Sequence, residues 1–426
     1  MRCIITSFVL LVIMIKEYGK HKHVLCATVV YPIMWIFSLL GLLLTDKYYV
    51  ISYEMLAIII IGYIVFCCGF NFCNRQGYSE TIYNAKFCDE NISEFGMSTA
   101  FIISLVIGVL YLYKVRNYIS LTSIATSLTM IRTNSANGNL SLPIYLVYLS
   151  GMVQCSMRIF LFVYLRNQEN TMSQKDIRQI RLKNRVIILF ILSLVILLTN
   201  FSRNSLLFFG LSIITIVLLT KKVKTKKIIL ILSILFLAFI GVFIWFSMFR
   251  DAYKYTSGNV WDTATTSLIM YLSGGLIAYD QSIQRGIVSI FAVNGLNHTG
   301  ALITSIIDLL CGTQLTPGVV LPSIAIGPSS GTNVYTVYYW TSLDLGVIFS
   351  IICQFFYGFL HGRLYCGVRK GSIRHTYWYC MIFYSLIMMF FEEQYFSIGQ
   401  SWLLRIIAYV IIGTMCGITR FKFVRR

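Results

Sequence analysis

Arginines set among apolar residues are the side chains of this sequence best suited to chemistry. Arg203 lies between two apolar stretches, flanked by Ser202 and Asn204 and far in sequence from any acid. A guanidinium can donate hydrogen bonds to two oxygens of one phosphate. We therefore expect Arg203 to bind a phosphate or diphosphate and to act in catalysis. The alternative is an arginine whose head group reaches out to the lipid headgroups.

Three further arginines and one histidine extend this set. We expect Arg285 to be catalytic, unless it only forms a salt bridge with Asp280, five residues earlier. Arg132 and Arg250 are expected to bind substrate, although Arg250 equally fits a solvated helix boundary. His298 lies in a segment rich in glycine and asparagine and is a candidate general base toward a hydroxyl group. A lone histidine is more often structural, and that alternative stays open.

An aromatic segment at 331–340 runs into an apolar stretch that begins near Asp344. Aromatic rings at such a boundary form an interfacial belt in many membrane proteins. Rings beside an acid at a helix start also suit a sugar, and on that interpretation Asn333, Tyr335 and Asp344 bind substrate. The cysteines fall mostly within apolar stretches and form no pair of CxxC units, so we expect neither a metal site nor a cofactor.

The composition decides which scaffold must hold these residues. The chain has 426 residues, of which 57% are hydrophobic and only 12% charged, while the net charge is +19. So few charges cannot cover a surface that faces water, which excludes a soluble enzyme and a nucleic-acid binder. The sequence predicts an all-α, polytopic integral membrane protein.

Apolar stretches of suitable length predict about eleven transmembrane helices. The predicted spans are 3–15, 27–44, 55–72, 97–113, 142–165, 186–200, 205–220, 228–248, 342–361, 377–391 and 402–419. Basic loops lie on the cytoplasmic side of a membrane, which assigns 166–185 and 221–227 to that side. Two short helices must then turn near Arg203, at the outer boundary.

This topology divides the chain into three parts. Residues 1–248 form an N-terminal bundle of about eight spans, residues 249–341 a large outer loop, and residues 342–426 about three spans with a cytoplasmic tail. Apolar patches at 267–278, 286–293 and 301–310 are too short to span, so we expect short interfacial or re-entrant helices there.

Two arginines fall inside predicted spans. Arg405 must face the interior of the bundle, and the simplest expectation is an ion pair with Glu392 or Glu393. Arg158 lies near a cytoplasmic boundary, and we expect its side chain to reach toward that boundary.

Three motifs, taken together with this architecture, resemble the oligosaccharide repeat-unit polymerases of the Wzy type, the O-antigen polymerases. One motif joins Asn333, Tyr335 and Thr336 to Asp344 and Gly346. The other two are Ser202-Arg203-Asn204-Ser205 between short apolar helices, and Tyr271-Leu272-Ser273-Gly274-Gly275 followed by Asp280. The resemblance covers most of the chain through its span count, its late outer loop and its short basic inner loops.

The resemblance implies a metal-independent glycosyltransferase of the GT-C type in the bacterial inner membrane. It would move a growing glycan from undecaprenyl diphosphate to the non-reducing-end hydroxyl of the next lipid-linked repeat unit, at the periplasmic face. Arg203, and then Arg250 and Arg285, would contact the anionic carrier, and Asp280 would bind substrate. The implied partners are the lipid-linked oligosaccharide, membrane lipids and a chain-length regulator, with no nucleic acid.

Two other functions stay open. An O-antigen ligase shares this plan and this donor but uses lipid A as its acceptor. A polysaccharide flippase or another transporter predicts internal repeats, compact loops and charges at the middle of the bilayer, whereas this sequence has a large outer loop and few charges within its spans.

Overall fold

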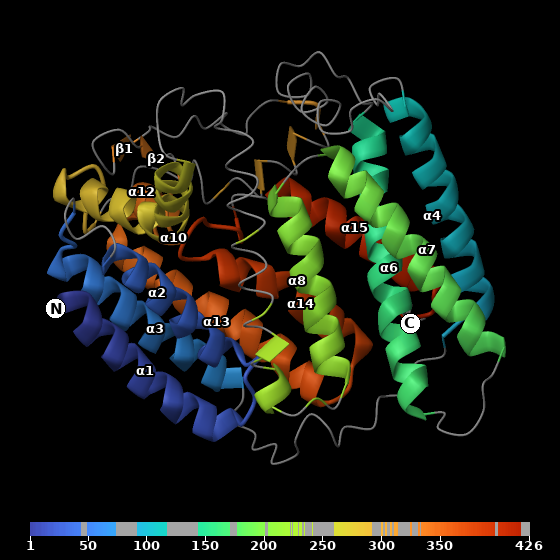
Figure 1. The fold of residues 1–426 in the computed structure, drawn as a ribbon, viewed down its shortest axis with the longest axis horizontal. Helices are drawn as coiled ribbons and strands as arrows, with labels where there is room; N and C mark the ends of the chain where they lie inside the picture. Colours follow the sequence, from blue (N-terminus) through green and yellow to red (C-terminus); the bar gives the residue numbers. More distant parts are fainter. Residues whose placement is uncertain are drawn as a thin grey trace, which may run out of the picture. The chain divides into compact units, whose positions relative to one another are not determined.

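Twelve helices and one short pair of strands are described in the computed structural model (Figure 1). The described residues are 1–43, 49–73, 92–116, 144–170, 177–200, 203–221, 260–291, 334–396 and 399–418, with shorter pieces at 223, 225–228, 230–231, 234, 241, 300, 303–304, 307–308, 311–313, 324–325 and 331–332. The strands β1 (Ile324–Ala325) and β2 (Gly331–Thr332) have two residues each and pair antiparallel. Apart from them, the regular structure of the described residues is helical, as the sequence predicts.

The helices follow the apolar pattern of the sequence. Their bounds are α1 Arg2–His21, α2 Ala27–Leu43, α3 Tyr53–Cys73, α4 Glu94–Val115, α6 Ile144–Asn170, α7 Ile177–Asn200, α8 Arg203–Thr220, α10 Val260–Gln284, α12 Tyr339–Leu345, α13 Val347–Arg369, α14 Ile373–Met388 and α15 Gly399–Met415. The structure has two separate helices where the sequence predicts a turn near Arg203: α7 ends at Asn200, and α8 begins at Arg203. The predicted span at 228–248 lies mostly outside the described residues.

Five of these helices are long and apolar enough to cross a bilayer, which needs about 20 residues. They cover Tyr53–Cys73, Glu94–Val115, Tyr148–Gln168, Arg178–Thr199 and Val347–Arg369. Shorter apolar helices cover Ala27–Leu43, Asn204–Thr220 and Ser401–Met415. The described part of the chain thus has the character of a membrane-embedded helical protein.

The predicted outer loop departs most from expectation. Instead of a short helix at 267–278, α10 runs for 25 residues. Its polar side chains Ser273, Asp280 and Ser282 are buried, because each finds a hydrogen-bond acceptor or donor nearby. Residues 285–291, within the patch expected to be helical, form turns and bends. Gly286 ends α10 with a φ of 69°, and the Ile287 N–H bonds the Ser282 carbonyl, the pattern of a glycine C-cap.

The chain divides into two compact units, each discontinuous in sequence. The first comprises residues 1–79, 223–366 and 382–399, and the second residues 80–222, 367–381 and 400–426.

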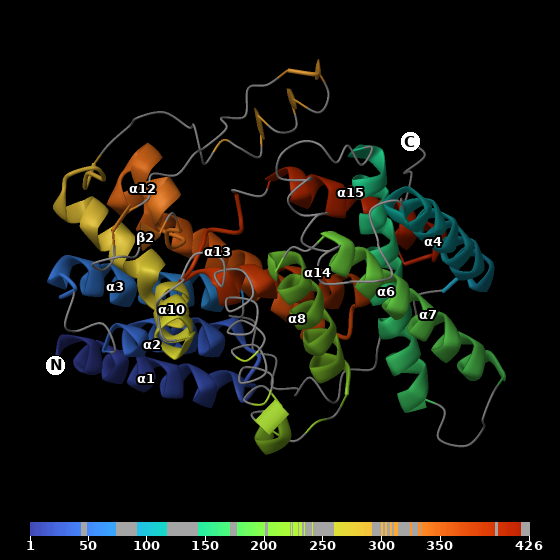
Figure 2. The same cartoon turned by 45° about the horizontal axis from the view of Figure 1, so that its top comes forward.

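In the first unit, α1, α2 and α3 pack side by side, and α10 contacts α2 (Figures 1 and 2). Glycines bring α3 and α13 together. A Cβ added at Gly358 of α13 would overlap the carbonyl of Phe66, and one at Gly69 of α3 would overlap the carbonyl of Phe355. Gly362 meets the backbone of Phe70 in the same way. The two backbones therefore approach each other along a seam of small residues, as in the GxxxG contacts of membrane helices.

In the second unit, α6 is central and contacts α4, α7 and α8. The end of α15 packs against the start of α4. The Ser93 N–H donates to the Cys416 carbonyl (2.9 Å), and Gly96 lies against the Met415 carbonyl. Ser93 also caps α4, because its hydroxyl accepts from the Gly96 N–H.

Candidate functional site

Asp280, near the end of α10, organises a polar cluster in the first unit. Its carboxylate is fully buried. It accepts hydrogen bonds from the Tyr49 hydroxyl (2.6 Å), the Ser52 N–H (2.9 Å), the Ser52 hydroxyl and the Gln284 amide (3.3 Å). Asp280 therefore fastens the segment that leads into α3 to the end of α10, and its oxygens are already well supplied with donors.

Arg285 lies one turn further on and is exposed. Its guanidinium donates to the Gln281 side chain (3.1 Å), whereas Asp280 is held by Tyr49, Ser52 and Gln284. Burial and the hydrogen bond to Asp280 raise the pKa of Tyr49, and the positive charge of Arg285 opposes that rise. Burial also raises the pKa of the Tyr335 phenol, and the positive charge of Arg285 again opposes that rise. Three residues predicted from the sequence, Asp280, Arg285 and Tyr335, are thus gathered at one end of α10.

The aromatic segment before α13 is folded inward. The ring of Tyr335 stacks on that of Tyr339, with 3.7 Å between ring centroids, and both are buried. Asp344 is also buried, on the short helix α12. Gly346, with a φ of 87°, separates α12 from α13. That left-handed backbone is why glycine stands in the Asp-x-Gly step of the sequence.

Tyrosine hydroxyls join this segment to α10 and α2. The Tyr279 hydroxyl lies 2.7 Å from the Ser342 hydroxyl, and the Tyr338 hydroxyl lies 2.7 Å from that of Tyr31 on α2. The Tyr338 ring occupies the space left by Gly62, in the middle of α3, where any Cβ would overlap it. Residues 334–345 therefore reach past the helix ends into the interior of the unit.

A second irregular segment, 389–396, also packs inside this unit. The Met389 carbonyl accepts from the Val337 N–H (2.8 Å). The buried Glu393 carboxylate accepts from the Tyr395 and Phe396 N–H groups. The Tyr395 hydroxyl lies 2.9 Å from His361 Nε2. At a rise of 1.5 Å per residue, His361 lies about 21 Å along α13 from Val347, the first residue of that helix. Non-helical backbone and polar groups at such depth are tolerated only when buried in protein or lining a cavity, and they commonly mark a binding site.

The second unit holds a different feature, a pair of arginines around Phe208, of which Arg158 is buried and Arg405 half-buried. Arg158, only 2% exposed, donates from Nε to the Ser212 hydroxyl (2.8 Å) and lies 5.1 Å from the Phe208 ring. Its Nη2 has no hydrogen-bond partner among the described residues. The Arg405 guanidinium lies 3.9 Å from the same ring and 4.8 Å from that of Trp402. Arg158 does not reach toward the boundary as expected; it lies inside, because helix α8 covers it.

Acids are scarce around this pair. Among α4, α6, α7, α8 and α15, only Glu94 and Glu169 are acidic, and each lies at a helix end. A guanidinium buried as deeply as that of Arg158 is costly in an apolar setting unless a negative charge lies beside it. Hydropathy could not identify this feature, because it does not say which face of a helix an arginine occupies.

The remaining predicted site residues are less fully described. Arg203 is the first residue of α8, before Phe208 on the same helix, and its side chain lies outside the described part. Arg132, Arg250, His298 and Asn333 also lie outside it.

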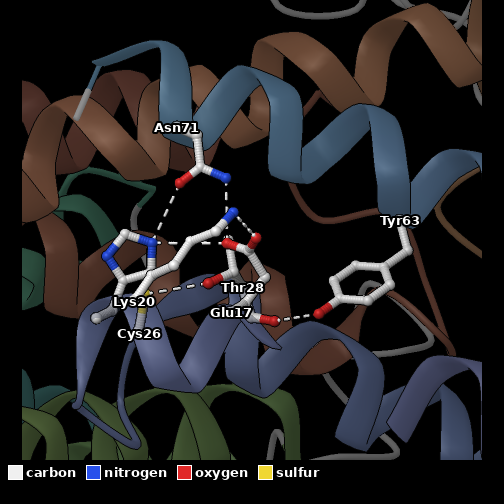
Figure 3. Close-up of polar contacts among 7 residues, drawn as sticks. Glu17, Lys20, Cys26, Thr28, Tyr63 and Asn71 are labelled. Atoms are coloured by element: carbon white, nitrogen blue, oxygen red, sulfur yellow. Dashed lines mark hydrogen bonds and ion pairs between the residues drawn. The ribbon is translucent and has the colours of Figure 1, made fainter. Parts of the chain in front are cut away.

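A polar clamp at the other end of the first unit was not anticipated (Figure 3). The buried Glu17 carboxylate accepts from the amine of Lys20 (2.5 Å) and the side-chain amide of Asn71 (3.1 Å), and His21 Nε2 lies 3.2 Å from the Asn71 side-chain oxygen. Burial opposes ionisation of Glu17, but hydrogen bonds from His21, Lys20 and Asn71 outweigh it and lower its pKa to about 2. Glu17 and His21 lie one helical turn apart, but only the fold reveals that Asn71 completes the clamp, which joins α1 to α3.

Among the described residues no group of three or more histidine, cysteine or acidic side chains is arranged to hold a metal ion. Comparison of the chain with protein-family models, with curated proteins and with solved structures finds no match.

Proposed function

We propose that this protein is a bacterial inner-membrane glycosyltransferase that polymerises lipid-linked oligosaccharide repeat units, an O-antigen polymerase. It transfers the growing glycan from undecaprenyl diphosphate to the non-reducing-end hydroxyl of the next lipid-linked unit, at the periplasmic face. The eleven-span topology and a GT-C-like arrangement are part of this proposal.

The observation that carries the proposal is the pair of arginines around Phe208. The donor of such a reaction ends in a diphosphate attached to a lipid, so its leaving group is a polyanion that enters from the membrane. Arg158 and Arg405 supply positive charge among the helices α4, α6, α7, α8 and α15, whose only acids, Glu94 and Glu169, lie at helix ends. Arg203 begins the helix that carries Phe208, which makes it the arginine best placed in sequence to extend this charge outward.

The reaction needs no redox change and no metal. The bond between the anomeric carbon and the diphosphate oxygen breaks, a bond from that carbon to the acceptor oxygen forms, and the acceptor proton passes to a base. Guanidinium groups stabilise the negative charge that develops on the departing diphosphate. His298 is our candidate for the base.

The first unit, taken by itself, carries other residues for which the proposal expects contact with substrate. Sugars bind against aromatic rings and polar side chains, and Tyr335, Arg285 and Asp344 lie in or beside the segment that packs on α10. Arg285 is the exposed member of this set and suits a phosphate of the substrate, whereas Tyr335 and Asp344 are buried and would shape the site from within the fold.

The test is the banding pattern of lipopolysaccharide in a deletion strain that carries plasmid-borne variants. Arg203→Ala should leave a single repeat unit on lipid A at normal protein levels. Arg116→Ala removes another arginine predicted to face outward, which stacks on Tyr113, and should leave the full ladder.

One outcome would remove Arg203 from the proposed mechanism, and another would overturn the proposed function. Full ladders with Arg203→Ala would exclude a catalytic role for Arg203. A deletion strain without any repeat unit on lipid A would favour the ligase or the flippase instead, because a polymerase is not needed to attach the first unit.

A further inference from the structure

A basic hollow lies between α4 and α7 in the second unit, away from the residues assigned above. It encloses about 390 Å³ and is lined by Glu94, Phe95, Ser98, Arg178, Arg181 and Arg185. The three arginines stand three and four residues apart, so they share one face of α7. The sequence places this region at the cytoplasmic boundary of the membrane.

Two of the arginines are fixed by α4, and the third is not. Arg178 Nε lies 3.6 Å from the Glu94 carboxylate, and Arg185 donates to the Ser98 hydroxyl (3.0 Å). Arg181 is exposed between them, and no hydrogen bond or ion pair joins it to another described residue. Among the described residues that line the hollow, Glu94 is the only acid, so its one negative charge faces three positive charges.

Apolar surface continues from the hollow along both helices. Phe95 at its edge is 83% exposed, and exposed side chains follow on α4 at Ile102 and on α7 at Ile188 and Ile191. A ligand with a negatively charged head group and hydrocarbon chains matches both the basic hollow and the apolar faces beside it. A free phosphate matches only the basic hollow.

We propose that the hollow binds the headgroup of one anionic phospholipid of the cytoplasmic leaflet. Its phosphate would meet Arg181 together with Arg178, and its acyl chains would lie along the exposed faces of α4 and α7. Basic recesses between membrane helices bind acidic headgroups in this manner. The proposal is independent of the glycosyltransferase activity.

Native mass spectrometry of the full-length protein in detergent can test it, with phosphatidylglycerol and phosphatidylcholine as probes. The intact protein should retain one phosphatidylglycerol more tightly than phosphatidylcholine. Arg181→Gln should weaken phosphatidylglycerol binding about fivefold, since each basic group near an anionic surface contributes about that factor. Arg178→Gln combined with Arg181→Gln should weaken it further. Because Arg181 is exposed, its replacement should not disturb folding, which an unchanged melting temperature would verify.

Lys183→Gln is the matched control. It removes the same charge from an exposed position of the same helix, outside the hollow. An equal loss of phosphatidylglycerol with Lys183→Gln would reduce the effect to general surface charge and overturn the proposal. Displacement of phosphatidylglycerol by millimolar inorganic phosphate would identify a phosphate site rather than a lipid site. Equal retention of both lipids would also contradict it.

Discussion

At the scale of single residues, this protein holds buried charge in two ways. Asp280 is surrounded by donors from Tyr49, Ser52 and Gln284, so its charge is satisfied by the chain itself. Arg158 has the hydroxyls of Ser212 and Tyr377 and two aromatic rings near it, and its Nη2 lacks a hydrogen-bond partner among the described residues. The first arrangement is typical of an anchor, whereas the second leaves capacity for a ligand.

The anchoring role of Asp280 makes a specific prediction. Asp280→Ala would leave the Tyr49 hydroxyl and the Ser52 N–H without their acceptor, and we expect a loss of about 3 kcal/mol in stability. The melting temperature of the purified protein measures it. Gln284→Ala, on the exposed side of the same helix end, should cost far less. A stable Asp280→Ala variant that fails only in activity would instead identify Asp280 as a substrate ligand.

At the scale of elements, sequence reasoning recovered the helices that coincide with an uninterrupted apolar run. The bounds of α2, α3 and α4 agree with the predicted spans to within a few residues. In these helices the apolar residues extend over nearly the whole helix, so the ends of the apolar stretch in the sequence are also the ends of the helix. It failed at α10 and at the start of α7. The buried serines and Asp280 lower the mean hydropathy of α10, so the sequence predicts a loop there. The arginines on one face of α7 likewise make the start of that helix resemble a basic loop. The partners that bury Asp280 lie more than 200 residues away, so no local pattern announces them.

The glycine seam between α3 and α13 is the element contact most sensitive to side-chain size. Gly358→Leu would push a side chain into the Phe66 backbone, which cannot move without separating the helices. We expect little folded protein in the membrane, as judged by size-exclusion chromatography in detergent. Gly210→Leu, where a Cβ meets open space, should fold normally. Normal folding of Gly358→Leu would show that α3 and α13 are not closely packed.

At the scale of the whole molecule, contacts within the first unit agree with an alternating topology. Tyr49 and Asp280 meet, and both lie in segments predicted to be outside. Glu17 and Asn71 meet, and both lie at helix ends predicted to be inside.

This topology predicts the side from which two cysteines react. Cys311 is exposed in the predicted outer loop, whereas Cys366 lies in the predicted cytoplasmic loop 362–376. A membrane-impermeant maleimide added to cells with a permeabilised outer membrane should modify Cys311 and leave Cys366 unmodified until the inner membrane is opened. Peptide mass spectrometry identifies the sites. The reverse pattern would invert the orientation and exclude a periplasmic active site.

The seam between α3 and α13 also sets an order of events during synthesis. Gly69 leaves the ribosome long before Gly358, and the largest part of the second unit, residues 80–222, is made between them. Until α13 is inserted, the glycine face of α3 must therefore contact lipid or another helix in a transient, non-native packing. If translation is stalled before α13, the attached chain should have residues 80–222 of the second unit protected from proteases. Its first unit should still be cleaved, because α13 is missing.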